Sequence, residues 1–472
     1  MNSNSVEPPT TDLSNSGVEA FGYRQELKRS LGLSDLLIYG LVFIVPTAPF
    51  PVFGIVFNAS KGMVPLVYAV GLVAMLFTAI SYMTMSKAFP VAGSVYTYAS
   101  RSLGEFAGFF AGWGILLDYL LTPTLIYVVC AIAVHSVVPE IPKGVWVASL
   151  LFFSTTVNFF GIETATRVNI ALLAVQLVLL AIFMVLGVIA LIHGVGGAHL
   201  SIAPLYNAKI ISPKVIFGAL SLAVLSFLGF DAISTLAEET RGGPHLVGRA
   251  TMLSLCLAAF LFVAQTYLAS LFVLGRTHFA PGDPTETAFY GIVTMVGGVW
   301  YKVVVSILGV LVSGIPAALT AQAATARLLY GMARDGQLPR ILAHIHPVQK
   351  VPDYAIACVA LVTLVLGLLL VSQLELLSSM VSFGALLGFL LLHCSVIAHG
   401  LRTRQLGSWL RFVVLPTVGF LIIAYVLINA QKNAQVAGGC WLALGAAIYV
   451  ELKRSGRPVA LVESDSPSGS EE

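Results

Sequence analysis

The sequence predicts an all-α membrane protein with about twelve transmembrane helices. Apolar residues make up 58% of the 472 residues and charged residues only 10%, whereas a soluble domain has about 25% charged residues. The apolar residues are gathered in stretches close to the roughly 20 residues that a helix needs to cross a bilayer. The basic residues are also distributed unevenly between alternate loops. Together these three features place the chain in a membrane.

The predicted spans follow one another with short polar connections. They cover residues 33–58, 63–87, 105–138, 145–161, 168–194, 213–238, 249–275, 288–332, 354–372, 376–400, 410–430 and 434–452. The eighth stretch is longer than one span requires, which predicts a short extra helix before it. Residues 31–455 are therefore expected to form a single domain of about twelve membrane helices.

The loop charges predict the orientation. An even number of spans puts both termini on one side, and the loops of that side carry 18 Lys and Arg against 7 on the other. Basic residues favour the cytoplasmic side. We therefore expect both termini in the cytoplasm and the chain in the cytoplasmic membrane. The polar tails, residues 1–30 and 456–472, are expected to be disordered.

Composition also excludes several classes of function. A net charge of +3 is too small to indicate a nucleic-acid partner. The five cysteines have no metal-ligand spacing, and the glycines form no phosphate-binding motif. We expect no metal, no cofactor and no enzyme activity. The expected partners are the lipid bilayer and a small-molecule substrate.

Asp231 lies in the sixth span, within the stretch VIFGALSLAVLSFLGFDAISTL. A carboxylate near the centre of a bilayer costs at least a few kcal/mol, and such residues usually face a cavity, a partner or a substrate. Gly229, which weakens a helix, comes just before the acid. An interruption over Ser226, Phe227, Gly229, Phe230 and Asp231 therefore predicts a site for a cationic substrate. The structural alternative is a carboxylate that caps a helix or pairs with a buried base.

The first span has its own interruption, over Pro46, Thr47, Ala48, Pro49 and Phe50. Each proline removes a backbone donor and clashes with the preceding turn, so the helix is expected to unwind. A simple kink is the alternative. Matching breaks in two halves of a chain indicate the substrate site of a secondary transporter at the middle of the membrane.

Asp118 in the third span is the second membrane carboxylate. It is a candidate for a second ammonium group or for a proton, with a structural hydrogen bond as the alternative. The rings of Phe50, Phe227, Phe230 and the adjacent Tyr119 are candidates for cation–π contacts, although most aromatic side chains in membrane spans serve only for packing.

Three segments resemble a known family. They are TARLLYGMARDGQLPRILAHIHP (Thr325–Pro347), SFLGFDAISTLAEET in the sixth span and FPVAGSVYTYASRSLG after the second. They are similar to segments of the amino acid–polyamine–organocation permeases, and the similarity extends along essentially the whole chain. The motifs LLDYL, which contains Asp118, and VPTAPFPVFGIV resemble those of putrescine importers.

The resemblance implies an inverted five-plus-five repeat, with residues 33–195 and 213–400 as the two halves and 410–452 as peripheral helices. It implies secondary active import by alternating access, of putrescine or a related polyamine, with proton coupling. An amino acid importer or exchanger of the same fold is the alternative, although the prolines at residues 46, 49 and 51 leave few N–H donors for a carboxylate. Some proton-coupled members carry a lysine where this chain has Gln176, so Asp118, Asp231 or an acidic residue in a loop would have to carry the proton.

Overall fold

The structure, a computed structural model, describes residues 31–89, 94–159, 166–231, 233, 240–241, 244–334, 338–347, 349, 351–403 and 409–454. Within these ranges the chain is almost entirely helical, with one isolated β-bridge between Leu31 and Thr240. This confirms the predicted all-α class. The two predicted disordered tails and the end of the predicted sixth span lie outside the described residues.

The helices follow the predicted spans closely. The longer helices are α1 (Leu33–Ile44), α2 (Pro49–Ser60), α3 (Val64–Ala88), α4 (Ser94–Leu103), α5 (Glu105–His135), α6 (Lys143–Phe159), α7 (Thr166–Ile192), α8 (Pro213–Ala223), α9 (Pro244–Leu271), α11 (Ala288–Leu308), α12 (Ile315–Arg334), α13 (Asp353–Leu370), α14 (Leu374–Arg402), α15 (Leu415–Ile428) and α16 (Lys432–Arg454). Short helical turns connect them: η2 (Val195–Gly197), η3 (Val224–Phe227), α10 (Asp283–Glu286), η5 (Gly309–Gly314), η6 (Arg340–Ala343) and η8 (Leu410–Val414).

Nine helical segments in the described part of the chain are long and apolar enough to cross a membrane, and the bent pair α1–α2 is a tenth. Two predicted spans fall below that length: α6 has 17 residues, and the apolar helix over Pro213–Phe227 is shorter still. α6 packs against α5 and α13. The count of twelve spans therefore stays a prediction.

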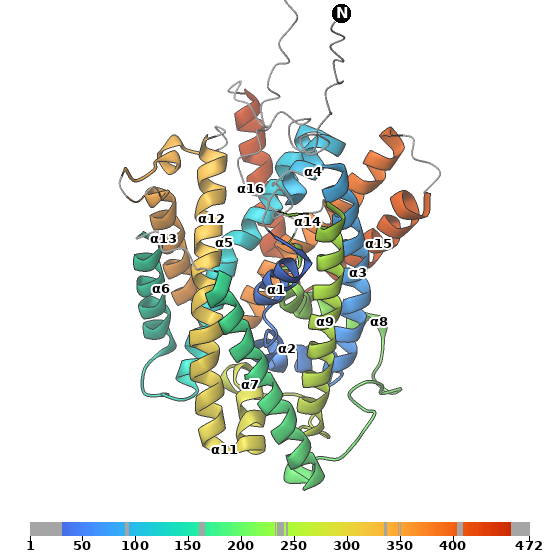
Figure 1. Cartoon of the computed structure of the whole chain (residues 1–472), viewed down its shortest axis with the longest axis vertical. Helices are drawn as coiled ribbons and strands as arrows, with labels where there is room; N and C mark the ends of the chain where they lie inside the picture. Colours follow the sequence, from blue (N-terminus) through green and yellow to red (C-terminus); the bar gives the residue numbers. More distant parts are fainter. Residues whose placement is uncertain are drawn as a thin grey trace, which may run out of the picture.

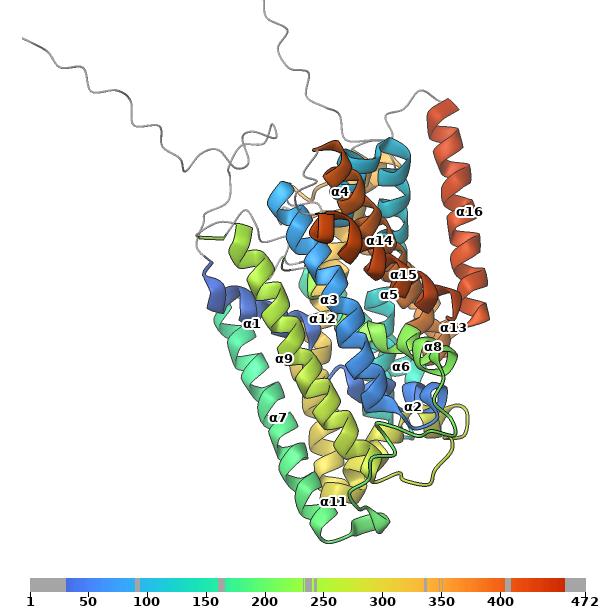
Figure 2. The same cartoon turned by 90° about the vertical axis from the view of Figure 1, so that its right-hand side faces the viewer.

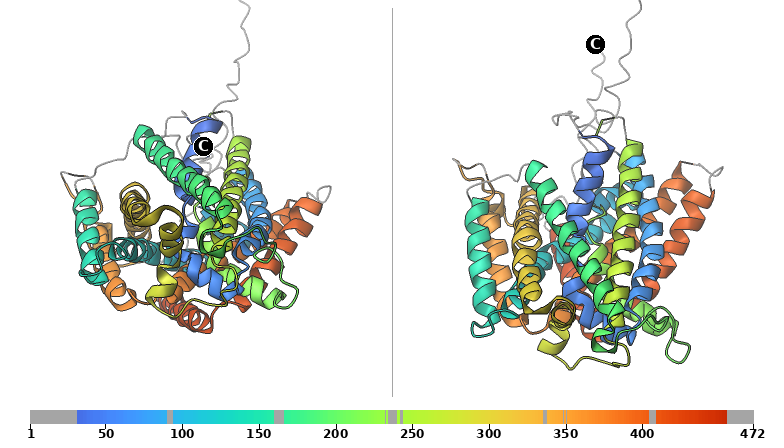
Figure 3. Two further views of the ribbon diagram at one scale, coloured as in Figure 1. Left: turned by 90° about the horizontal axis from the view of Figure 1, so that it is seen from below. Right: turned by 60° about the horizontal axis from the view of Figure 1, so that its bottom comes forward.

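The long helices form a bundle with distinct loops at its two ends (Figure 1). α4 lies at the upper end in this view, whereas α7 and α11 reach the lower end. The view turned by 90° shows the same division and puts α16 at the outer edge of the bundle (Figure 2). Figure 3 shows α1 between α7 and α9, and these are helices that it packs against.

The long eighth stretch contains the extra helix that its length predicts. A break at Gly298, where φ is +77°, divides α11 into two helical pieces. A π-helical turn, η5, then leads into α12. Left-handed backbone is readily available to glycine, which explains why the break falls there.

Two tryptophans fasten α16 to the bundle. The Trp113 indole on α5 donates a hydrogen bond of 2.8 Å to the Trp441 carbonyl on α16, and the Trp441 indole donates one of the same length to the Trp113 carbonyl. The two ring systems stack with centroids 4.6 Å apart. In a membrane a buried N–H without an acceptor is costly, so this reciprocal pair satisfies both indoles.

Candidate functional site

The first span is broken where the prolines predict. α1 ends at Ile44 and α2 begins at Pro49, and the two axes differ by 57°. Proline suits the first position of a helix because no intrahelical donor is needed there. Val45 between them has φ of +58°, which is strained for a β-branched residue. Such strain persists only where the surrounding structure imposes it.

The sixth span also breaks, slightly earlier than predicted. α8 ends at Ala223, and η3 continues the chain as a tighter 3-10 turn to Phe227. The interruption therefore begins before Ser226, because 3-10 turns commonly close the end of an α-helix. Gly229 follows with φ of +109°, a conformation that other residues rarely adopt.

The two breaks touch each other. A Cβ atom added at Gly229 would lie 2.9 Å from both the carbonyl carbon and the carbonyl oxygen of Phe43, near the end of α1. The backbone of the second break is thus packed on the backbone of the first. Glycine is required here for its conformation and for its size.

Each carboxylate accepts a hydrogen bond from its own segment. The Gly229 amide donates to Asp231 Oδ1 at 3.2 Å, and the Thr122 hydroxyl donates to Asp118 Oδ1 at 2.9 Å. Gly384 on α14 lies against the backbone of Asp118 and holds α5 and α14 close together. Both aspartates are half-buried rather than buried.

The structure brings Asp118 and Asp231 close enough to interact electrostatically. The Tyr119 side chain interacts electrostatically with both aspartates and with Tyr39 on α1. Tyr39, Asp118, Tyr119 and Asp231, called the Asp118–Asp231 site below, thus come from α1, α5 and the second break. Two carboxylates in a medium of low dielectric constant repel each other strongly, so a cation or a proton between them is stabilising.

The first break offers few backbone donors. Pro46, Pro49 and Pro51 have no N–H, and the amides of Val45, Ala48 and Phe50 donate to Leu41, Val45 and Thr47 respectively. Within residues 45–51 the Thr47 amide remains. Thr47 and Ala48 are half-buried at this break. The first break therefore has few backbone N–H groups that could bind a carboxylate.

Gln265 on α9 braces the first break. Its side-chain amide donates to the Pro46 carbonyl at 2.9 Å and to the Leu261 carbonyl at 3.0 Å, and the residue is fully buried. The contact supports the unwound backbone from the neighbouring helix.

The other predicted site residues contact the packed core. Ser226 shares a hydrogen bond of 2.8 Å with the Tyr68 hydroxyl. The Phe50 ring stacks on Phe289, with centroids 3.8 Å apart. Phe227 packs against Phe262. Phe230 lies 5.8 Å from Phe389, centroid to centroid, and is fully buried. The cation–π role of these three rings stays a prediction.

Gln176 on α7 is buried and donates to the Val312 carbonyl in η5 at 3.4 Å. A π-helical turn leaves backbone groups without their usual helical partners, and the amide satisfies one of them. Gln176 therefore links α7 to the π-helical turn as a neutral donor.

Four residues at the site were not predicted from the sequence: Tyr39, Thr122, Gln265 and Thr325. Thr122 stands four residues after Asp118, a spacing that puts both on one helix face, so it was detectable. Gln265 is a lone amide in an apolar stretch, which is also a signal. The Thr325 hydroxyl donates to the Tyr119 carbonyl at 2.6 Å. This residue lies in a predicted loop motif, and no sequence signal points to its contact with Tyr119.

Known proteins resemble this chain along most of its length. It is 32% identical over 431 residues to the low-affinity putrescine importer PlaP of Escherichia coli (strain K12), covering 89% of this chain and 93% of that protein. It is 26% identical over 461 residues to the branched-chain amino acid permease BcaP of Bacillus subtilis (strain 168), covering 92% and 94% respectively. It is 23% identical to a methylthioribose transporter of the same organism, covering 90% and 93%.

Helices broken near half-buried carboxylates, together with these relatives, define the protein as a multi-pass membrane transporter and not an enzyme. A family profile described as amino acid permease matches residues 50–431. The chain belongs to this family, and the resemblance drawn from its motifs is confirmed.

Proposed function

We propose that the chain is a secondary active transporter that imports a small organic cation, putrescine or a related polyamine, by alternating access. Both termini would lie in the cytoplasm, as the bias of 18 to 7 basic residues favours. Import from outside then uses the face that carries α10 and the start of α16.

The observation that carries this proposal is the electrostatic interaction between Asp118 on α5 and Asp231 at the second break. A diamine has two ammonium groups, and each finds a carboxylate here. The attraction between opposite charges is far stronger in a medium of low dielectric constant than in water. Backbone carbonyls near the breaks and the Tyr119 hydroxyl would complete the binding of the ammonium hydrogens.

The distribution of backbone donors supports a substrate without a carboxylate. A bound carboxylate needs N–H donors, and the first break has prolines at residues 46, 49 and 51. At the second break, the Gly229 amide already donates to the protein's own Asp231. A zwitterionic amino acid would therefore find few partners for its anionic end.

Import would be coupled to protons through Asp118 or Asp231. Gln176 has no titratable proton and donates to the Val312 carbonyl. The two interacting carboxylates remain as the groups at the site that can exchange a proton for an ammonium group.

The second candidate is an amino acid importer or exchanger. The observation that favours it is the 26% identity to a branched-chain amino acid permease over nearly the whole chain. In this reading Asp231 would contact the amino group of the substrate, and Asp118 would have a structural role through Thr122.

A competition series separates the two candidates. Purified protein in lipid vesicles takes up labelled putrescine while unlabelled putrescine, cadaverine, lysine, alanine or glutamate is added. Diamines are expected to compete at the lowest concentration. Stronger competition by alanine or glutamate than by either diamine would establish the amino acid candidate instead.

A further inference from the structure

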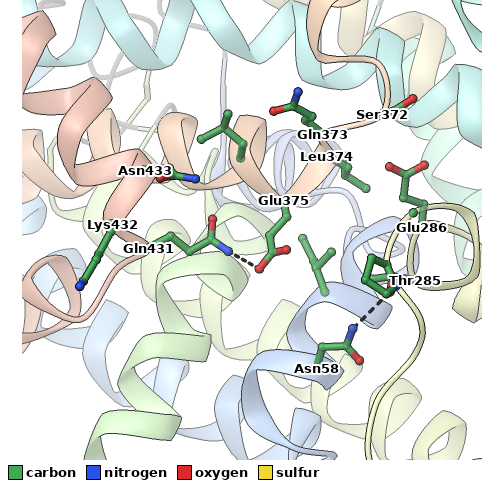
Figure 4. A pocket seen from close by; sticks show the side chains of 14 residues that line it. Asn58, Thr285, Glu286, Ser372, Gln373, Leu374, Glu375, Gln431, Lys432 and Asn433 are labelled. Carbon is green, nitrogen blue, oxygen red and sulfur yellow. Dashed lines mark hydrogen bonds between the residues drawn. The ribbon is translucent and has the colours of Figure 1, made fainter.

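A cavity of about 530 Å³ lies at the end of the bundle that holds α10. Its walls come from four segments that are distant in sequence: the end of α2, α10, the turn between α13 and α14, and the start of α16 (Figure 4). The loop charges predict that this end faces outward. The cavity therefore lies where an imported solute would first meet the protein.

The lining is polar and contains two carboxylates, Glu286 and Glu375. Side-chain amides surround them, among them Asn58 and Gln431. Glu375 points into the middle of the cavity, whereas the amino group of Lys432 points away from it (Figure 4). The basic residue of the lining thus leaves the carboxylate accessible to another cation.

The charges of the two glutamates are compensated to different degrees. Glu286 is buried and contacts the Lys143 amino group, which also lies 2.5 Å from Asp283 Oδ1. Glu375 is exposed, and its hydrogen-bond donor is the neutral amide of Gln431. The uncompensated charge of the cavity is therefore the one on Glu375.

The wall between α2 and α10 is held in place by Asn58. Its amide donates to the Phe279 carbonyl at 3.0 Å and to the Thr285 hydroxyl at 3.2 Å, and its oxygen accepts from the Phe279 amide at 2.7 Å. Gly54 on α2 packs directly on the Thr285 carbonyl. This wall of the cavity is thus held by contacts within the protein.

This cavity is separate from the Asp118–Asp231 site. Asn58 stands nine residues beyond Pro49 on the same helix, which corresponds to about 14 Å along its axis. A putrescine-sized diamine is shorter than that distance. One molecule therefore cannot contact the first break and the far end of α2 together.

We propose that this cavity is a second, weaker binding site for primary amines, in which Glu375 receives an ammonium group before the substrate moves inward. The inference rests on the proposed function for the identity of the substrate. A negative cavity at an entrance raises the local concentration of cations and speeds their association. The side-chain amide oxygens around Glu375 would accept hydrogen bonds from the ammonium group.

The test uses a reporter at the rim of the cavity. Gln373, an exposed lining residue, is changed to cysteine in a protein whose exposed Cys256 and Cys440 are serine. A membrane-impermeant thiol reagent labels it, and putrescine is added as the probe. Putrescine is expected to slow labelling, and to do so equally when Asp231→Asn disables the inner site.

Glu375→Gln is expected to raise, by at least tenfold, the putrescine concentration that slows the labelling by half. Lys432→Met, a matched change of charge in the same lining, is expected to leave it intact or strengthen it. Protection that survives Glu375→Gln, or that disappears with Asp231→Asn, would overturn the proposal.

A second measurement avoids the cysteine background. In vesicles, Glu375→Gln alone is expected to slow uptake at low putrescine concentration and to weaken its dependence on salt, because screening acts on exposed charges. Unchanged uptake and salt dependence would contradict the entrance site. If putrescine slows the labelling at residue 373 but is not transported, the proposed function is refuted and the cavity site stands. If putrescine is transported but does not slow the labelling, the cavity site is refuted and the proposed function stands.

Discussion

The backbone of Gly229 in the second broken helix lies directly against the carbonyl group of Phe43 at the end of α1. This contact joins the two interruptions, which are far apart in sequence, into one structural element. Because Asp231 follows Gly229 by two residues and accepts its amide hydrogen, the position of the carboxylate depends on this contact.

Gly229→Ala is expected to abolish transport. The added Cβ would clash with the Phe43 carbonyl, and alanine is strained at φ of +109°. Uptake into vesicles measures the effect. Gly439 on α16, where an added Cβ meets open space, provides the control as Gly439→Ala. Equal uptake by the two variants would show that the contact is dispensable.

Asp231→Asn is expected to reduce putrescine uptake at least about tenfold, which corresponds to roughly 1.4 kcal/mol of lost binding. The amide keeps the size of the side chain but loses the charge that would hold an ammonium group. Expression and thermal unfolding in detergent are expected to stay near those of the unchanged protein. Full transport by this variant would leave Asp231 with a structural role.

A pH gradient, alkaline inside, is expected to drive accumulation of putrescine, and sodium is not expected to be needed. The two interacting carboxylates of the Asp118–Asp231 site are the titratable candidates, since Gln176 is neutral. Vesicles loaded with buffers of different pH and assayed with and without sodium give the answer. Uptake that requires sodium and ignores the gradient would rule out proton coupling.

Lys143→Met is expected to destabilise the protein by about 3–5 kcal/mol, the usual effect of leaving a buried ion without its partner. The stranded group is the Glu286 carboxylate, which is buried and has Lys143 as its ion-pair partner. Adding Glu286→Gln to Lys143→Met should restore much of the loss. Thermal unfolding of the three variants measures this, and an additive double variant would disprove the pairing.

The ion pair at Asp283 predicts the behaviour in acid. The hydrogen bond from Lys143 holds the pKa of the Asp283 carboxyl below its usual value. Its stabilising effect is therefore complete above the unfolded pKa of about 4 and is lost as the pH falls through the lowered pKa. Because the Asp283 side chain is 65% exposed, the effect is at most about 1 kcal/mol.

Thermal unfolding between pH 7 and pH 3 tests this expectation. Asp283→Asn should lower stability by a constant small amount above about pH 4, and the difference from the unchanged protein should shrink below it. If the stability difference between the unchanged protein and Asp283→Asn grew as the pH fell, the lowered pKa of Asp283 would be contradicted.

Much of the fold followed from local sequence. The prolines at residues 46 and 49 and the glycine at residue 229 specify backbone conformations by themselves, so both breaks could be predicted. The apolar stretches likewise predicted nearly every helix. The length of the eighth stretch predicted the extra helix that Gly298 creates.

The contacts between segments could not be predicted in the same way. Lys143 and Glu286 are distant in sequence, and neither carries a local signal for the other. The ring of Phe230 meets Tyr82 and Phe389 because the helices pack with a particular rotation, which a single sequence does not reveal. The aspartates could be identified from the sequence because a charged side chain within a membrane span is costly and usually has a functional role.

The exchanged hydrogen bonds of Trp113 and Trp441 have a practical consequence for anyone who shortens this protein. A truncation between α15 and α16 would remove a helix at the bundle's edge. It would also leave the Trp113 indole without its acceptor, the Trp441 carbonyl, and the Trp113 carbonyl without its donor, the Trp441 indole. α5, which carries Asp118, would then expose an unpaired N–H to lipid. The last helix is thus a support for the third span, and affinity tags belong after Arg454 rather than in its place.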